Sequence, residues 1–273
     1  YGRYAYVGGK FHCCVGNETG LFRVDLNTGR IEKIVDSAET VTSVVTDGAK
    51  IYYSTYTGYD VPTSWKYSLK CADLEKKEIT EILSDVDYPI RSLKMSEGNL
   101  FFNSGGRGGI RCLFPDGTLR SVSSDSCSEY AVDRDTVYTF SLSTDGTDFV
   151  YKVCACNLQG ERIGFSETRE SAEESGNHTR RKRCYVGSGR DGITVFDGRV
   201  VFFDDQGVWL EDLADGSTEK ILDDPFGFED PYSYEFVSKA VFDGKLFLCW
   251  SDENRTDRLI IYDSGEVRQM TLG

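Results

Sequence analysis

Residues 47–54 read Asp-Gly-Ala-Lys-Ile-Tyr-Tyr-Ser, a glycine turn followed at once by a short apolar and aromatic run. Aromatic and β-branched residues directly after a glycine turn predict a β-strand that begins at a tight hairpin. The same order of residue types occurs five more times, at residues 9–11, 97–103, 134–138, 197–204 and 243–248. The copies are spaced by about 47 residues on average, and self-similarity at such a period predicts a repeat architecture.

A second tight turn follows each of these copies by roughly 20 residues and contains glycine in most of them. These turns lie at residues 25–29, 73–76, 115–117, 157–160, 213–216 and 262–265. Two tight turns and two looser connections per repeat define four strands. In the second repeat we expect these strands at residues 42–46, 51–54, 67–73 and 78–83.

A four-stranded antiparallel unit that recurs six times without helical periodicity is typical of a β-propeller blade, since one blade cannot bury both of its faces alone. We therefore predict an all-β fold, a six-bladed β-propeller, with a β-sandwich as the alternative. One propeller domain is expected over residues 1–273. Its approximate blades are residues 1–40, 41–86, 87–126, 127–168, 184–224 and 233–273, with residues 169–183 as an inserted loop.

The repeats resemble the six-bladed propellers of the low-density-lipoprotein-receptor type, whose blades carry a Tyr-Trp-Thr-Asp tetrad, and the bacterial propellers likened to them. Residues 51–54, 100–103 and 201–204 occupy the position of that tetrad, and residues 21–26 resemble the third strand of the family's blade. No repeat carries the intact tetrad, and TolB-like propellers share the same order of turns and strands. The resemblance thus implies a fold and a tendency to bind partners, and it implies no catalytic residue.

Charge and hydropathy restrict the partners of the chain. It has 273 residues, with 31 Lys and Arg against 45 Asp and Glu, which gives a formal net charge of -14. Binding to nucleic acid needs a cationic surface that releases counterions, so we expect no nucleic-acid partner. The longest apolar run, residues 246–250, is far shorter than the roughly 20 residues that span a bilayer, so we expect no membrane insertion.

The first residue is Tyr1 and no signal sequence follows it, which predicts a processed chain or an excised part of a longer protein. We expect a monomer at an extracellular or cell-surface location, with a cytoplasmic location as the alternative.

The nine cysteines form no Cys-x-x-Cys pair, so a zinc ribbon is not indicated. Most of them lie in apolar runs and are expected to be free core thiols, with one or two disulfides as the alternative.

The longer connections gather on one face of the predicted propeller, because strand direction alternates within a blade. We name it the long-loop face and its opposite the short-turn face. The long segments are residues 55–66, 104–109, 141–148, 164–189, 223–234 and 251–257. Insertions of a repeat fold usually carry its function, so the long-loop face is the predicted binding face.

Two of these loops combine aromatic rings with carboxylates, and a third has an arginine at its tip. Such rings can stack on sugars while polar groups bind hydroxyls, or they can anchor a protein partner. The alternative is that they cover the blade edges. The candidate ligand-binding residues are Tyr56, Tyr59, Asp60, Trp65, Arg107, Phe226, Phe228, Glu229 and Tyr232.

Sets of catalytic residues are missing from the sequence. There are only two histidines, no Gly-x-Ser-x-Gly motif and no calcium-loop spacing. We therefore expect no catalytic residue, no metal and no cofactor, and we interpret the chain as a non-enzymatic module that binds a carbohydrate or a protein. One alternative is a glycoside hydrolase or lyase that uses loop carboxylates such as Asp60 and Glu229. The other is a structural spacer domain.

Overall fold

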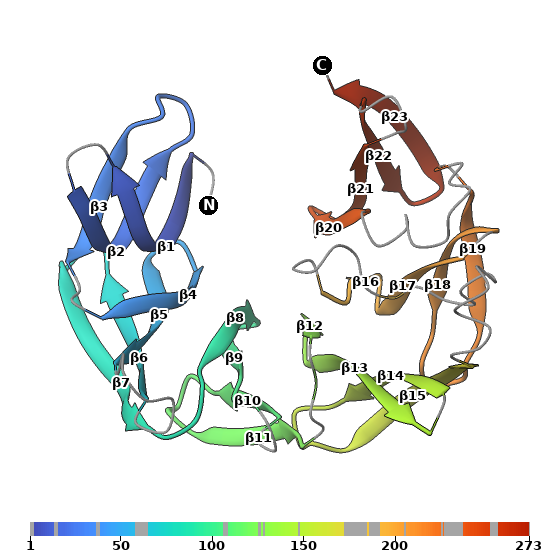
Figure 1. Cartoon of the computed structure of the whole chain (residues 1–273), viewed down its shortest axis with the longest axis horizontal. Helices are drawn as coiled ribbons and strands as arrows, with labels where there is room; N and C mark the ends of the chain where they lie inside the picture. Colours follow the sequence, from blue (N-terminus) through green and yellow to red (C-terminus); the bar gives the residue numbers. More distant parts are fainter. Residues whose placement is uncertain are drawn as a thin grey trace. The chain divides into compact units, whose positions relative to one another are not determined.

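A computed structural model shows an all-β chain (Figure 1). The structure describes residues 3–13, 16–36, 39–57, 65–105, 109–124, 127, 129–146, 148–171, 185, 192–204, 206–224, 226, 237–251 and 256–272. Within these residues, no helix has the length and apolar character needed to cross a membrane.

Five of the six sheets have four antiparallel strands in chain order. Two of them are β4 (Thr40–Thr46), β5 (Lys50–Thr57), β6 (Lys66–Asp73), β7 (Glu78–Val86), and β8 (Arg91–Ser96), β9 (Asn99–Asn103), β10 (Ile110–Leu113), β11 (Leu119–Ser123). The next two are β12 (Glu129–Asp133), β13 (Thr136–Asp145), β14 (Asp148–Cys156), β15 (Arg162–Ser171), and β16 (Val195–Phe196), β17 (Arg199–Asp204), β18 (Gly207–Glu211), β19 (Thr218–Asp223). The last is β20 (Ser238–Phe242), β21 (Lys245–Ser251), β22 (Asp257–Asp263), β23 (Glu266–Leu272).

The first sheet has three strands, β1 (Tyr4–Cys13), β2 (Gly16–Asp25) and β3 (Ile31–Asp36). The prediction of a turn at residues 9–11 is wrong, because β1 runs straight through them and Gly9 pairs with Gly20 of β2. Glycine is also found inside extended strands, so Gly9 by itself does not indicate a turn. The described part of this sheet holds no strand equivalent to the first strand of the other five.

The glycine turns of the other repeats form as predicted. In the β16–β17 hairpin, Asp197 and Gly198 both have positive φ, 51° and 71°, as a two-residue type I′ turn requires. Aspartate closes the β4–β5 turn differently: Asp47 Oδ1 accepts the backbone N–H groups of Ala49 at 2.9 Å and Lys50 at 2.7 Å. These local hydrogen bonds explain why acidic and glycine residues recur together in the repeats.

Strand positions in the second repeat agree with the prediction, and two predicted loops are shorter than expected. Residues 141–145 continue β13 and residues 164–171 continue β15. Both extensions are paired with β14 along their length, so backbone hydrogen bonding makes strand of most of residues 141–148 and of the first eight residues of 164–189. The connection between β13 and β14 is therefore short, while the one between β15 and β16 still spans residues 172–194.

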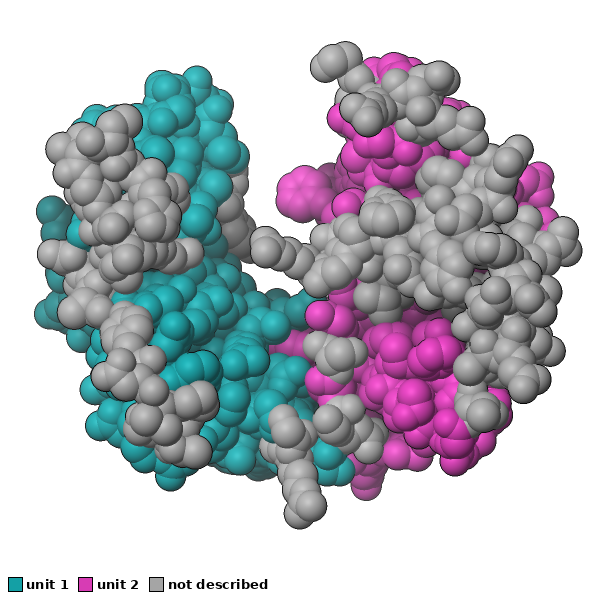
Figure 2. Space-filling view, viewed as in Figure 1, with its two compact units in different colours: residues 1–126 teal, residues 127–273 magenta. Residues whose placement is uncertain are grey.

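The chain divides into two compact units, residues 1–126 and 127–273 (Figure 2). In unit 1, one apolar cluster lies between the β1–β3 and β4–β7 sheets and a second between the β4–β7 and β8–β11 sheets. In unit 2, one cluster lies between the β12–β15 and β16–β19 sheets and another between the β16–β19 and β20–β23 sheets. Each sheet thus buries apolar side chains against a neighbour, as expected for stacked blades.

The six cysteines with described side chains are free thiols, namely Cys71, Cys112, Cys127, Cys154, Cys156 and Cys249. Cys112, Cys154 and Cys156 are buried. Burial raises the pKa of the Cys112 thiol to about 12, which keeps it protonated and unreactive at neutral pH. None of these six forms a disulfide, as predicted, but only three lie in the core, since Cys71, Cys127 and Cys249 are half-buried.

Candidate ligand-binding site

Three of the nine predicted site residues lie in the part of the chain that the structure describes: Tyr56, Trp65 and Phe226. The other six lie outside the described residues, and they remain predictions. These are Tyr59, Asp60, Arg107, Phe228, Glu229 and Tyr232.

Phe226 belongs to the core of unit 2. Its side chain is buried, and its ring meets Phe203 edge-on at 5.4 Å and Trp250 edge-on at 4.9 Å between centroids. Edge-to-face contacts of this kind stabilise an apolar core. The aromatic character of this loop is therefore explained at Phe226 by packing, and we leave Phe226 out of the site.

Tyr56 and Trp65 form an aromatic pair at the long-loop face of unit 1. Tyr56 lies near the end of β5 and Trp65 immediately before β6, so the loop that joins these strands brings them together. Their ring centroids are 5.5 Å apart, and the buried Tyr67 lies 6.1 Å from Tyr56. Tyr56 and Trp65 are only half-buried, so each ring keeps an accessible part while its base is fixed by the core.

Trp65 also has an unmatched polar group. Its indole Nε1 is enclosed and has no hydrogen-bond partner among the described residues. A buried N–H without an acceptor costs about 1–3 kcal/mol. Within the described residues this donor therefore remains unmatched.

Arg111, at the start of β10, adds a cation to the same region. It packs on the side of the β8–β11 sheet that faces the β4–β7 sheet, because it pairs with the buried Phe102 in the register of β9 and β10. Its guanidinium carbon lies 4.0 Å from the centroid of the Tyr88 ring. Tyr56, Trp65 and Tyr88 all pack against the apolar cluster that contains Phe102. We name Tyr56, Trp65, Tyr88 and Arg111 the aromatic rim.

Sequence reasoning missed Tyr88 and Arg111. It selected Arg107, from the tip of the loop that precedes β10, and read β10 as a plain strand. One sequence signal could have indicated Arg111. In the strand Ile-Arg-Cys-Leu, residues 110–113, Arg111 lies two residues before the buried Leu113 and therefore on the same face of the sheet. Because a charged side chain on a core-facing strand position is unusual, it indicates either a structural partner or a binding role.

The charged groups around the aromatic rim are mostly paired. Lys66 forms an ion pair with Asp87, and Asp85 is exposed at the end of β7. On the opposite face of the β4–β7 sheet, Lys70 Nζ lies 2.7 Å from Glu39 Oε2. Burial is the largest single influence and acts to raise the pKa of Glu39, but the hydrogen bond from Lys70, the interaction with the Thr55 hydroxyl and the charge of Lys70 together outweigh it, so the pKa lies below its usual value.

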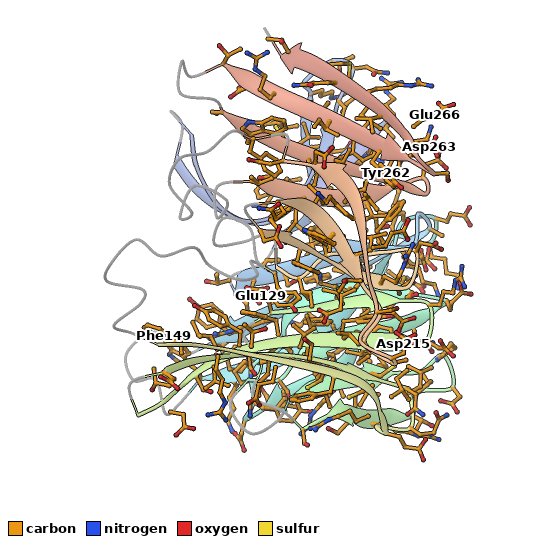
Figure 3. The ribbon with its side chains drawn as sticks, turned by 90° about the vertical axis from the view of Figure 1, so that its right-hand side faces the viewer. Glu129, Phe149, Asp215, Tyr262, Asp263 and Glu266 are labelled. Atoms are coloured by element: carbon orange, nitrogen blue, oxygen red, sulfur yellow. The ribbon has the colours of Figure 1, made fainter. Side chains whose placement is uncertain are left out.

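Cavities lined by described residues lie beside the turns of the short-turn face. The cavity of about 520 Å³ in unit 2 lies beside the turns that contain Arg134, Asp197 and Gly244. Figure 3 shows this arrangement: the turn residues Asp215, Asp263 and Glu266 lie on one side of unit 2, and Phe149, beside the β13–β14 connection, lies on the other. The cavity lining mixes aspartate with arginine, and Arg199 is already paired with Glu219 at 2.5 Å.

A buried polar cluster ties Tyr185 to three sheets of unit 2. Tyr185 Oη donates to Glu211 Oε2 at 2.6 Å, and Ser166 Oγ donates to Glu211 Oε1 at 3.0 Å. Lys239 Nζ donates to the Tyr185 carbonyl oxygen at 2.5 Å and lies 5.1 Å from the Phe203 ring. Glu211, Lys239 and Tyr185 are all buried, so these groups hold the fold together and are closed to a ligand. We name these four hydrogen-bonded residues the Tyr185 cluster.

The described residues contain no group of three or more His, Cys, Asp or Glu side chains arranged to hold a metal ion. The aromatic rim therefore offers two kinds of interaction: the accessible parts of the Tyr56 and Trp65 rings for stacking, and the terminal N–H groups of Arg111 as donors.

No family model and no curated protein match the sequence. Among solved structures, oligogalacturonate lyase from Vibrio parahaemolyticus is 16% identical, with a TM-score of 0.55 over 90% of this chain and 72% of that one. The acylaminoacyl peptidase from Pyrococcus horikoshii is 14% identical, with a TM-score of 0.55 over 99% of this chain and 44% of that one. TolB from Acinetobacter baumannii aligns over 98% of this chain and 69% of its own at 15% identity and a TM-score of 0.45, too low to support an argument.

The six antiparallel sheets and these likenesses define the class of the protein: it is a six-bladed β-propeller, as the repeats predict. At such low identity the likeness concerns the fold alone. The resemblance to the low-density-lipoprotein-receptor type of propeller stays a prediction, since none of these comparisons bears on it.

Proposed function

We propose that this propeller is a non-enzymatic binding module that takes a carbohydrate at the long-loop face, in the outer domain of a bacterial surface or secreted protein. The observation that carries the proposal is the aromatic rim, where the half-buried rings of Tyr56 and Trp65 lie 5.5 Å apart over a rigid base. Sugar rings present apolar C–H faces that stack on such aromatic surfaces, while their hydroxyl oxygens accept hydrogen bonds from N–H donors.

The rigidity of the rim favours binding further. Tyr56 is fixed by Tyr67, whose own ring is buried in the cluster between the two sheets. Because a pre-organised ring loses little conformational freedom when a ligand arrives, more of the contact energy is retained in the affinity.

Titration with a glycan panel, followed by tryptophan fluorescence and calorimetry, tests the proposal. The chain has three tryptophans, Trp65, Trp209 and Trp250. We expect a bound glycan to change the fluorescence of wild type and of Trp209→Phe, and to leave that of Trp65→Phe unchanged. By calorimetry, Tyr56→Ala and Trp65→Ala each weaken binding by about two- to tenfold, the value of one stacking contact.

Equal binding by wild type and by the Tyr56→Ala, Trp65→Ala double variant would place the ligand elsewhere and contradict the proposal.

The lyase alternative depends on Asp60 and Glu229, outside the described residues. It makes a separate prediction: a bound glycan is cleaved, and Asp60→Asn or Glu229→Gln abolishes the cleavage without weakening binding. A protein partner would instead be captured by the intact domain and lost by the same Tyr56→Ala, Trp65→Ala variant.

A further inference from the structure

We propose that Arg111 receives a carboxylate of the ligand, so that the sugar bound at the aromatic rim is acidic. This inference rests on the proposed function and names the chemical class of its ligand. It starts from an imbalance of charge: the chain has 45 acidic residues against 31 basic ones, yet Arg111 has no acidic partner among the described residues.

Two other arginines of unit 1 have acidic partners, whereas Arg30, Arg91 and Arg120 have none among the described residues but are exposed, unlike the half-buried Arg111. Arg3 pairs with Asp25, and Arg23 Nη2 lies 2.7 Å from Glu32 Oε2. Arg111 has instead the face of Tyr88, at 4.0 Å. A cation over an aromatic ring is stabilised by the quadrupole of the ring, but this contact uses the flat face of the guanidinium and leaves its edge available for hydrogen bonds.

The accessibility of the three nitrogens of Arg111 determines how a ligand can approach. Nε is enclosed and has no hydrogen-bond partner. The two terminal nitrogens have no acceptor among the described residues either, and neither is enclosed. The free edge is therefore the terminal pair, whose parallel N–H groups match the two oxygens of a carboxylate.

The neighbours of Arg111 support a sugar carboxylate over a free anion. Tyr56, Trp65 and Tyr88 pack on the same cluster, and the guanidinium of Arg111 lies over the ring of Tyr88, so we infer that a sugar stacked on these rings presents a substituent to Arg111. Asp87 is neutralised by Lys66, while Asp85 is exposed and repels anions through solvent, which weakens the effect. Since net charge disfavours an anionic ligand at long range, the attraction we infer is local to Arg111.

The matched control is Arg120 of β11. Its guanidinium also lies over an aromatic ring, 5.1 Å from the centroid of Phe114, but on the short-turn face of the same sheet. Arg120→Gln therefore removes the same charge and the same type of stack at a distance from the aromatic rim.

The experiment measures, by calorimetry, the binding of hexuronate tetrasaccharides built on glucuronate, mannuronate or galacturonate. Each is compared with its carboxyl-reduced neutral counterpart. We expect one acidic form to bind at least tenfold more tightly than its neutral counterpart, with affinity that falls as salt is raised. Arg111→Gln should weaken binding of the acidic form by about ten- to a hundredfold, the value of a charged hydrogen-bonded pair. Arg111→Lys should recover part of the loss, and Arg120→Gln should bind as wild type does.

Two results would overturn the inference. If acidic and neutral forms bind equally and Arg111→Gln binds both as wild type does, the carboxylate contact is refuted while the proposed function stands. If no glycan of either form binds to a folded protein, the proposed function and the inference both fail. Thermal unfolding of each variant, within a few degrees of wild type, shows that a loss of binding is not a loss of fold.

Discussion

The Tyr185 cluster of unit 2 and the aromatic rim of unit 1 both set polar groups against aromatic rings, yet they differ in how those groups are satisfied. In the Tyr185 cluster, the hydroxyl of Tyr185 and the carboxylate of Glu211 are 2.6 Å apart and both are buried. In the aromatic rim, Nε1 of Trp65 and Nε of Arg111 are enclosed and have no hydrogen-bond partner within the described part of the chain. One cluster is complete in the folded chain, and the other is incomplete.

This difference separates structural polar groups from candidate binding groups. Buried polar groups that satisfy one another stabilise a single arrangement of the core. Donors that stay unmatched lower stability, and they persist in a protein when function requires them. Burial and charge alone would have selected the Tyr185 cluster as the site, whereas hydrogen-bond matching selects the aromatic rim.

The largest effect is expected at the Tyr185 cluster. Glu211→Ala removes the acceptor of Tyr185 and Ser166, so we expect unit 2 to lose about 2–4 kcal/mol in the free energy of unfolding. Chemical denaturation measures it. The control is Glu219→Ala, which breaks the ion pair with Arg199 in a side chain that is 58% exposed and should cost less than about 1 kcal/mol. Equal losses in the two variants would erase the contrast between the clusters.

Arg111→Met tests the aromatic rim in the same way as Glu211→Ala tests the Tyr185 cluster. It removes an enclosed, unmatched N–H and keeps the length of the side chain, so we expect the free energy of unfolding to stay within about 1 kcal/mol of wild type. Binding of the acidic glycan should weaken in the same variant by about ten- to a hundredfold, as in Arg111→Gln. A destabilisation as large as that of Glu211→Ala would mean that Arg111 is a structural residue like those of the Tyr185 cluster.

A smaller effect concerns acid. Asp25 accepts a hydrogen bond from Arg3, and backbone N–H groups of Asn27 and Thr28 also donate to it, which together lower the pKa of its carboxyl from 3.8 to about 2. A carboxyl with a lowered pKa contributes stability above its unfolded value, and this contribution is lost as pH falls from about 3.8 toward 2. We expect Asp25→Asn to lower the melting temperature at pH 7 and to show a shallower decline between pH 4 and pH 2 than wild type. Parallel declines in the two proteins would contradict this assignment.

The smallest effect is expected for Trp65→Phe. The change removes the unmatched indole N–H and keeps an aromatic face, so stability should change by less than about 1 kcal/mol and calorimetric affinity by less than threefold. Trp65→Ala is the matched loss of the ring. If Trp65→Phe binds as weakly as Trp65→Ala, the indole N–H and not the stacking surface is the contact that matters.

The fold was predictable because its determinants are local. A type I′ turn needs positive φ at two consecutive residues, so the pair Asp197 and Gly198 predicts the hairpin from the sequence alone. Gly9 shows the limit of this reasoning: glycine also fits an extended strand, and only the pairing with Gly20 reveals that β1 continues.

The site was only partly predictable, because it depends on packing between strands distant in sequence. Tyr56 and Trp65 were found through the composition of one loop. Arg111 was missed, since its stack on Tyr88 forms only when β10 lies beside the β7–β8 connection. Phe226 was selected by the same loop rule and lies in the core, because no sequence pattern distinguishes a ring that folds inward from one that stays accessible.

The central claim is that the ligand binds at the long-loop face of unit 1. Hydrogen exchange with and without a bound hexuronate tetrasaccharide tests this claim most directly. We predict that protection on binding is confined to the ends of β5, β6 and β10 and to the β7–β8 connection, around Tyr56, Trp65, Tyr88 and Arg111. Protection at the turns beside Arg134, Asp197 and Gly244, where the cavity of about 520 Å³ opens on the short-turn face, would contradict it.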